Sequence, residues 1–285
     1  MYIITGATGH IGSEVVKALL AASQRVTGIT SDPANKKKIE SQGAAAVVAD
    51  VSDTPKLTEV FNKGIRLYLL NPPAPIDGDP SEKENTQVDS LIAAIRKSTF
   101  EKVVAASTYG AQQGKRLGDL DVLFNMEGKL KGAVRDCCII RGAYYLSNWD
   151  MAISMARSDG KIYSLYPPAF KLPMVAPADL AARAVSALLS PPAGHELIQL
   201  EGPARYSAND IAKTLGDILH KRIQAVSIRQ EDWHPWLVKS GFSPRAAESM
   251  VNMTRLTLEG HFPDEKDVEK GDTTPEMYFR KLLKK

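Results

Sequence analysis

The chain is poor in cysteine: its only two, Cys137 and Cys138, are adjacent within an apolar run. Neighbouring side chains of a strand point to opposite faces, so we expect two small buried residues and no disulfide between them. Such sparing use of cysteine is typical of the reducing cytoplasm. The chain also lacks an apolar run near the ~18 residues of a membrane-spanning helix. A secretory signal peptide is not expected either, because the amino terminus reads as a strand followed by a glycine turn.

The chain also has little net charge. Its 36 lysine and arginine residues exceed the 33 aspartate and glutamate residues by three, which argues against nucleic acid or an anionic membrane as a partner. The histidines, at positions 10, 195, 220, 234 and 261, lack the spacing of metal ligands, so we expect no metal site. The sequence has neither a Gly-x-Ser-x-Gly elbow nor a Gly-Lys-Ser/Thr phosphate loop. These exclusions leave a small molecule as the expected partner of a monomer or homodimer.

The most informative motif lies at the amino terminus. A short apolar run, Tyr2 to Ile4, leads into glycines at 6, 9 and 12, and a helical pattern follows. Gly6 permits a sharp turn, Gly9 permits close approach of a pyrophosphate, and Gly12 permits close packing of the helix on the strand. The amino end of the helix offers free N–H groups and a positive dipole to phosphates. We therefore predict a dinucleotide site, with a tight turn without ligand as the alternative. Its residues are Gly6, Ala7, Thr8, Gly9, His10, Ile11 and Gly12.

Apolar runs alternate with helical patterns through the first half of the chain. Further strands are predicted at 25–30, 45–49, 65–70, 102–106 and 136–140, and helices at 33–42 and around 88–95. Strands that are apolar on both faces and separated by helices are typical of a parallel sheet covered on both sides. The pattern therefore predicts an α/β fold with a Rossmann-type doubly wound parallel sheet. Such a sheet binds its ligand at the carboxyl ends of the strands.

The second half of the chain is organised differently. Residues 144–170 are rich in aromatics, prolines and methionines, and a helix is predicted over 177–189 and strands over 196–200 and 223–228. Ser207 suits the cap of a following helix, and 231–258 reads as two helices broken near Gly241. We therefore divide the chain into a dinucleotide-binding domain, 1–142, to whose sheet 174–200 returns, and a smaller α+β substrate and lid region, 143–173 and 201–285. The smaller region is expected to lack an independent core.

The residues after the second strand choose between the two nicotinamide dinucleotides. Binding of the unphosphorylated form usually requires an acidic residue there for the ribose hydroxyls. Ser31 can donate a hydrogen bond to a 2′-phosphate, and Lys36 or a neighbouring lysine can neutralise it. Asp32 leaves the choice open, because it can face the ribose or start the next helix. We expect NADP(H) to be favoured over NAD(H), although the lysines can equally form a solvated helix face.

Residues that follow the later strands complete the predicted cofactor site, because strand ends face the ligand in such a sheet. In chain order they are Asp50 and Val51 near the adenine, Leu70, Asn71 and Pro72 near the pyrophosphate and ribose, Ser107, Thr108 and Tyr109 near the nicotinamide, and Tyr144 and Tyr145 after the sixth strand. Without a lysine partner Tyr109 is a weak proton donor, and simple packing at the strand end is the alternative.

These motifs resemble the NmrA-like branch of the atypical short-chain dehydrogenase/reductases over nearly the whole chain. The likeness is carried by residues 5–12, 31–33, 50, 103–107 and 140–145, together with Asn148. The resemblance implies a dinucleotide bound to the amino-terminal sheet. It also implies either reduction of quinones or related acceptors, or a redox-sensing regulator without turnover. Ser31 departs from the family, in which arginine is common at that position.

The chain lacks the Tyr-x-x-x-Lys pair with which typical short-chain reductases move a proton. None of its nine tyrosines is followed by lysine four residues later, and Leu123 and Glu127 stand where the family resemblance places the pair. Carbonyl reduction by the usual route is therefore not expected. A quinone does not need the pair, because its reduced anion is conjugated and takes its proton from water. Tyr144, Tyr145 and Trp149 offer a flat apolar wall to such a ring, with lid core as the alternative.

We thus expect an NAD(P)H-dependent oxidoreductase that reduces quinone-like or other aromatic or conjugated acceptors by hydride transfer. The sequence assigns no catalytic residue. A non-catalytic NADP-binding redox sensor is the alternative, which the missing Tyr-Lys pair favours. An epimerase of nucleotide sugars is the weakest hypothesis, because its oxidation step needs the missing base.

Overall fold

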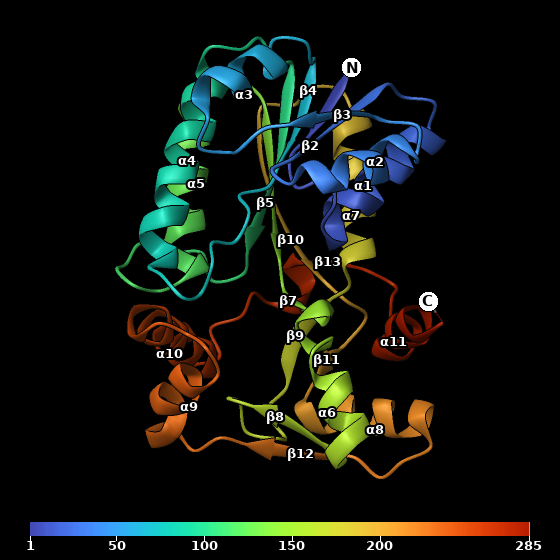
Figure 1. Cartoon of the computed structure of the whole chain (residues 1–285), viewed down its shortest axis with the longest axis vertical. Coiled ribbons are helices and arrows are strands. Elements are labelled where there is room, and N and C mark those ends of the chain that lie inside the picture. Colours follow the sequence, from blue (N-terminus) through green and yellow to red (C-terminus); the bar gives the residue numbers. More distant parts are fainter. Residues whose placement is uncertain (285) are drawn as a thin grey trace.

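A computed structural model describes residues 1–284 and shows a large sheet with helices on both faces (Figure 1). Among these residues the sheet has eight strands in the order β13-β10-β6-β5-β4-β1-β2-β3, all parallel to their neighbours. In chain order the strands are β1 (Tyr2–Ile4), β2 (Val26–Thr30), β3 (Ala45–Val48), β4 (Arg66–Leu69), β5 (Lys102–Thr108), β6 (Cys137–Gly142), β10 (His195–Glu201) and β13 (Glu269–Lys270). The strand order reverses between β1 and β4. The predicted Rossmann-type α/β fold is confirmed.

Two hydrophobic clusters attach the helices to the two faces of the sheet. One face carries α1 (His10–Ala21), α2 (Lys36–Glu40) and α7 (Pro177–Leu189), and the other carries α3 (Thr54–Phe61), α4 (Pro80–Arg96) and α5 (Asp119–Lys131). The adjacent cysteines follow this division, since Cys137 packs with α3 to α5 and Cys138 packs with α1 and α7. Both are buried free thiols, as predicted.

Most predicted elements are confirmed with shifts of one or two residues at their ends. Helix α7 matches its predicted range, and Gly241, at φ +98°, separates α9 (Trp233–Lys239) from α10 (Pro244–Leu258). The helix predicted over 33–42 is shorter, because η1 (Pro33–Asn35) is a 3-10 turn and α2 ends at Glu40. Helix α3 was not among the predicted elements. It is short, but its apolar residues at i, i+3 and i+4 are all buried.

The smaller carboxyl-terminal region contains a sheet of order β11-β9-β7 and a pair of strands, β12-β8. Its elements are β7 (Tyr144–Tyr145), η2 (Leu146–Trp149), α6 (Ala152–Asp159), β8 (Lys161–Ser164), β9 (Leu172–Val175), β11 (Arg205–Tyr206), α8 (Ala208–Leu219), β12 (Gln224–Ser227), η3 (Gln230–Asp232), α9, α10, η4 (Glu265–Asp267) and α11 (Pro275–Leu283). Ser207 caps α8 as predicted: its Oγ accepts from the Asp210 N–H at 3.2 Å, and the Asp210 carboxylate accepts from the Ser207 N–H at 2.8 Å. This reciprocal pair is a capping box.

This region has a core of its own, contrary to the expectation from its interrupted sequence. One cluster buries Leu146, Trp149, Ile162, Ile211 and Phe279, which come from segments on both sides of the return to the large sheet. Each short element contributes only a few apolar side chains. The core forms because distant segments combine them, and a pattern confined to neighbouring residues does not reveal this.

The carboxyl-terminal helix α11 joins the two parts of the molecule. Tyr278 donates its hydroxyl to the Asp150 carboxylate at 2.8 Å, and Lys281 Nζ lies 3.8 Å from a Glu14 carboxylate oxygen on α1. The smaller region therefore contacts the helix that follows the glycine turn. Within residues 1–284 no helix combines the length and the hydropathy that crossing a membrane would require.

Candidate cofactor and active site

Of the three glycines in the turn between β1 and α1, Gly9 is exposed to solvent and has space beside its Cα atom. Gly6 has φ +63° and accepts a hydrogen bond from the Gly9 N–H at 3.0 Å. A Cβ atom added at Gly12 would lie 2.1 Å from the Gly6 carbonyl oxygen, so a side chain there would push α1 off the turn. Gly9 is exposed, and a Cβ atom there would meet only the Gly6 oxygen, at 3.4 Å. The fold therefore requires glycine at position 12, whereas at Gly9 it leaves backbone that a ligand can approach.

Helix α1 presents an uncapped amino end beside this open backbone. Its N-cap residue is Gly9, no side chain caps it, and its first turn has no acidic residue. The first N–H groups of such a helix attract anions. His10 is exposed and its Nε2 lies 3.9 Å from the Asp150 carboxylate, whereas Ala7 and Ile11 are buried and Thr8 is half-buried. The arrangement fits the phosphates of a dinucleotide.

Thr5 fixes this turn to the next strand of the sheet. Its hydroxyl lies 3.0 Å from the Leu70 carbonyl oxygen, and the Leu70 N–H donates to the same hydroxyl at 2.7 Å. A Cβ atom at Gly6 would come within 3.0 Å of the Leu70 side chain. Leu70 therefore lies directly beside the glycine turn at the reversal of strand order, the point at which ligands bind to sheets of this kind.

The side chains expected to select the cofactor follow β2 and lie at the surface. Ser31 is exposed, and Lys36 is exposed with its Nζ 3.7 Å from a Glu40 carboxylate oxygen. The Asp32 carboxylate accepts hydrogen bonds from the Ala34 N–H at 2.8 Å and from Asn35 Nδ2 at 3.2 Å. Asp32 therefore starts the next helical turn, one of the two roles that the sequence leaves open for it.

The residues after β3 and β4 differ in burial. Asp50 is exposed and accepts from the Ser52 N–H at 2.7 Å, whereas the Val51 side chain is buried. Asn71 and Pro72 are half-buried. Asn71 donates through Nδ2 to the Glu84 carbonyl oxygen at 3.4 Å, and its buried Oδ1 accepts no hydrogen bond from any residue in 1–284. An unpartnered buried oxygen at the carboxyl edge of the sheet suits a ligand donor.

The three residues predicted to follow the fifth strand do not face one site, and two of them, Ser107 and Thr108, lie within β5 itself. Ser107 is fully buried on the α5 side of the sheet. Tyr109 packs in the cluster with α1 and α7, and its buried hydroxyl is unpartnered within the described chain. Thr108 is half-buried. The packed position of Tyr109 agrees with the alternative stated for it above, because a mostly apolar ring gains more from burial than from water.

Glu127 is part of a buried ionic network at the carboxyl end of β5. Its Oε1 accepts from the Ser107 hydroxyl at 2.5 Å and from Arg141 Nε at 2.8 Å, and its Oε2 accepts from Arg141 Nη2 at 2.7 Å. This two-pronged pairing joins α5, β5 and β6. Glu127 carries a negative charge that Arg141 neutralises, so it cannot replace the positive charge that a lysine at this position would bring.

The aromatic residues after β6 divide between surface and core. Tyr144 and Tyr145 are half-buried. Trp149, expected beside them in an aromatic wall, is buried in the core of the smaller region, where its ring centroid lies 6.3 Å from that of Tyr144. This agrees with lid core, the alternative stated for Trp149 above: its indole ring lies among apolar neighbours, and only the two tyrosines keep partly exposed side chains.

Two acidic residues near the same edge escape the sequence motifs. Glu84 on α4 is buried and accepts from the Ala74 N–H at 2.8 Å; burial, and secondarily the negative charge of Asp119, raise the pKa of its carboxyl to about 7. Asp119, the first residue of α5, is exposed, yet surrounding protein raises its pKa by desolvation. The sequence signal that could have pointed to Asp119 is its spacing: it lies four residues, about one helical turn, before Leu123.

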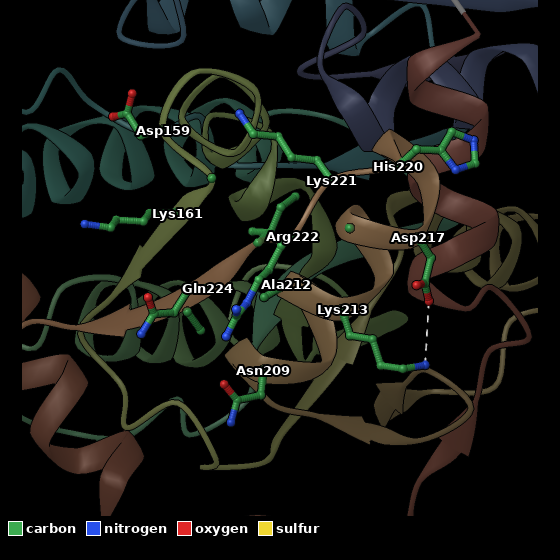
Figure 2. Close-up of a pocket in the computed structure, with 14 residues that line it drawn as sticks. Asp159, Lys161, Asn209, Ala212, Lys213, Asp217, His220, Lys221, Arg222 and Gln224 are labelled. Carbon is green, nitrogen blue, oxygen red and sulfur yellow. Dashed lines mark ion pairs between the residues drawn. The ribbon is translucent and has the colours of Figure 1, made fainter.

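Two hollows lie in the smaller region. One of about 1000 Å³ opens between α6, β8, α8 and β12; Figure 2 shows Lys161, Arg222 and Gln224 around it, and Lys213 Nζ lies 3.6 Å from the Asp217 carboxylate. A second, of about 680 Å³, lies along α6. Both are lined by residues of the smaller region, and the second includes Asp150, whose carboxylate lies 3.9 Å from His10 Nε2 at the glycine turn. In the described part of the chain, no three potential metal ligands cluster together.

Comparison with known proteins agrees with this architecture. The model of a family described as NAD(P)H-binding matches residues 6–131. The chain is similar to an NAD(P)H azoreductase of Xenophilus azovorans (22% identity, covering 90% of this chain and 87% of the relative). It is also similar to quinone oxidoreductase 2 of Escherichia coli (23% identity, covering 95% of this chain and 93% of the relative).

Two further likenesses concern the fold and the family. The solved structure of the Escherichia coli quinone oxidoreductase with NADPH has a TM-score of 0.81 at 22% identity and covers 99% of this chain and 100% of that one. An NmrA-like family oxidoreductase of Penicillium ochrochloron is 31% identical over 158 residues, which is 51% of this chain and 47% of the relative. With the glycine turn, the sheet order and the match to the NAD(P)H-binding family, these likenesses agree with the resemblance to the NmrA-like branch of the atypical short-chain dehydrogenase/reductases that the sequence predicts.

Proposed function

We propose that this protein is an NAD(P)H-dependent oxidoreductase that passes hydride to quinones, azo compounds or other conjugated acceptors. The observation that carries the proposal is the bare, uncapped start of α1 at Gly9, beside the reversal of strand order. The dinucleotide supplies the hydride when it is bound. The turn from Gly6 to Gly12 would hold the phosphates, and Asn71 would offer its free Oδ1 to the ligand. The similar azoreductase and quinone oxidoreductase support the choice of acceptor.

The proposed reaction proceeds without a Tyr-Lys pair. Leu123 has no proton to give, and Glu127 is held by Arg141 in a buried ion pair. A conjugated acceptor tolerates the loss of this particular pair, because its two-electron reduced anion is delocalised and can take its proton from a group other than a lysine-activated tyrosine. The half-buried Tyr144 and Tyr145 would contact the flat face of the acceptor. The smaller region, 143–173 and 201–285, would then form the substrate side of the site.

We further propose that NADP(H) is preferred to NAD(H). Ser31 is exposed after β2, where its hydroxyl can donate to a 2′-phosphate, and Lys36 follows within the next turn. The Asp32 carboxylate already accepts from the Ala34 N–H and from Asn35 Nδ2, contacts that direct it to its own helical turn. The similarity to the NADPH-bound quinone oxidoreductase supports this preference.

The test of the function is oxidation of NADPH in the presence of an acceptor panel. We expect the absorbance of the reduced cofactor to fall with quinones and azo dyes and to stay constant with simple ketones, which need the missing pair. NADPH binding, measured by calorimetry, separates the two hypotheses. Tight binding without turnover on any acceptor would contradict the reductase and favour the redox sensor.

Replacing Ser31 with aspartate is expected to weaken NADPH binding about tenfold or more, because a carboxylate would repel the 2′-phosphate. Binding of NADH should improve, because the new carboxylate can accept from the ribose hydroxyls. Both affinities are measured by titration calorimetry. Ser41→Asp, which adds the same charge at the far end of α2, is the control. Unchanged affinities for both cofactors in Ser31→Asp would show that position 31 does not select the cofactor.

A further inference from the structure

Asp119 occupies an unusual position at the start of α5. It is the first residue of a 13-residue helix and follows Gly118, whose φ of +62° turns the chain into the helix. The residue is open to solvent, and its carboxylate receives no hydrogen bond from the described residues 1–284, although protein surrounds it closely enough to raise its pKa. A solvent-accessible carboxyl group within surrounding protein is available to a ligand.

The helix directs Asp119 toward the carboxyl edge of the sheet. Asp119, Leu123 and Glu127 are spaced by four residues and so share one face of α5. Glu127 on that face reaches Ser107 near the end of β5. Because α5 runs back from the carboxyl end of β5 in this parallel fold, Asp119 lies about one turn closer to that edge than Leu123. Leu123 is the position at which the proton-donating tyrosine of typical short-chain reductases would be expected.

The groups that act on Asp119 electrostatically come from both sides of β5. Burial is the main cause of the raised pKa of Glu84 on α4, and the negative charge of Asp119 adds to it; the Glu84 carbonyl oxygen accepts from Asn71 after β4. Burial also raises the pKa of Tyr145, which follows β6, and the charge of Asp119 adds to that shift. Burial raises the pKa of Asp119 itself, and the negative charge of Asp121 on the same helix adds to this shift. Asp119 is therefore within electrostatic reach of residues that flank the end of β5, where the nicotinamide is expected.

We propose that the Asp119 carboxyl group donates the proton that accompanies hydride transfer to the acceptor. The inference rests on the proposed reductase function. The dihydronicotinamide loses a hydride and is oxidised, and the acceptor gains that hydride with its electron pair and is reduced. The O–H bond of Asp119 breaks as a new O–H or N–H bond forms on the acceptor. The carboxylate left behind takes its replacement proton from water, so one hydride and one proton are consumed in each turnover.

The test compares acceptors that need a proton with one that does not. A quinone or azo dye takes up a hydride and a proton, whereas a cationic triphenylmethane dye is neutralised by hydride alone at its central carbon. We expect Asp119→Asn to lower kcat with a quinone about 100-fold while keeping the KM for NADPH and the turnover of the cationic dye. Asp119→Glu should restore much of the quinone activity. Asp217→Asn, an exposed carboxylate on α8, is the matched control.

A second readout does not depend on turnover. In protein labelled with 13C at its carboxyl groups, the NMR signal that disappears in Asp119→Asn should titrate above the usual range of aspartate, and NADPH should shift it. In the wild type kcat with quinone should fall as pH rises through that titration, because the donor loses its proton, and Asp119→Asn should lack this limb.

Each outcome decides a different question. Equal loss with both acceptor types would make Asp119 a positioning residue, and unchanged quinone turnover would remove it from the reaction; either result overturns the proposal. An ordinary pKa that NADPH does not shift also overturns it. A wild type that reduces no acceptor at all contradicts the proposed function itself, and the proton-donor assignment falls with it.

Discussion

Replacing Gly9 with valine is expected to abolish measurable NADPH binding while the protein remains folded. Gly9 has φ −76° and a Cβ atom there would meet only the Gly6 oxygen at 3.4 Å, so the fold accepts a side chain. The added methyl groups would occupy the space in which the pyrophosphate approaches the backbone. We expect a loss of affinity of at least about 100-fold, or about 2.7 kcal/mol. Titration calorimetry measures it, and circular dichroism checks the fold.

Gly12 provides the contrasting control. A Cβ atom at Gly12 would lie 2.1 Å from the Gly6 oxygen and 2.7 Å from its carbonyl carbon, which are backbone atoms with little freedom to move. Gly12→Ala should therefore lower the melting temperature in the absence of any cofactor, unlike Gly9→Val. If Gly9→Val bound NADPH with the affinity of the wild type, the proposed placement of the pyrophosphate would be wrong.

Glu127→Leu is expected to destabilise the protein by about 3 kcal/mol, near the lower end of the range for breaking one side of a buried ion pair. The substitution leaves the Arg141 guanidinium without its two-pronged partner and the buried Ser107 hydroxyl without its acceptor. The value is placed near the lower end because Arg141 keeps some contact with water. Urea denaturation followed by circular dichroism measures the free energy of unfolding.

The double variant Glu127→Leu with Arg141→Met separates charge from shape. Removing both charges removes the unpaired guanidinium, so we expect the double variant to be more stable than Glu127→Leu alone. A single variant as stable as the wild type would show that this network contributes little to folding. The experiment also bears on the reaction, because an ion pair that serves only stability should leave NADPH affinity unchanged in variants that remain folded.

The sequence alone predicts a feature correctly where the interactions that form the feature lie within one short segment. The glycine turn, the end points of α7 and the Ser207 cap each depend on residues within a few positions of one another. The opposite faces of Cys137 and Cys138 follow from strand geometry alone. The interruption of the late helical segment near Gly241 follows from its positive φ. None of these features needed a distant contact to be predicted.

The candidate site was harder to predict because its residues are adjacent only in space. Glu127 was recognised as unable to replace a lysine, but its partners, Ser107 and Arg141, are 20 and 14 residues away in the sequence. Asp119 belongs to no motif, and the two groups whose pKa its charge affects, Glu84 and Tyr145, belong to other elements. The core around Trp149 likewise gathers residues from segments separated by the return to the large sheet.

The order of residues along the chain determined the alternation of strands and helices and the bare turn at Gly9, because backbone freedom and hydrophobic period are local properties. Only the tertiary structure decided that Arg141 neutralises Glu127 and that Asp119 remains open to solvent. The physical reason is that the energy and ionisation of a charged side chain depend on what surrounds it. Those surroundings come from parts of the chain that meet only when the sheet assembles.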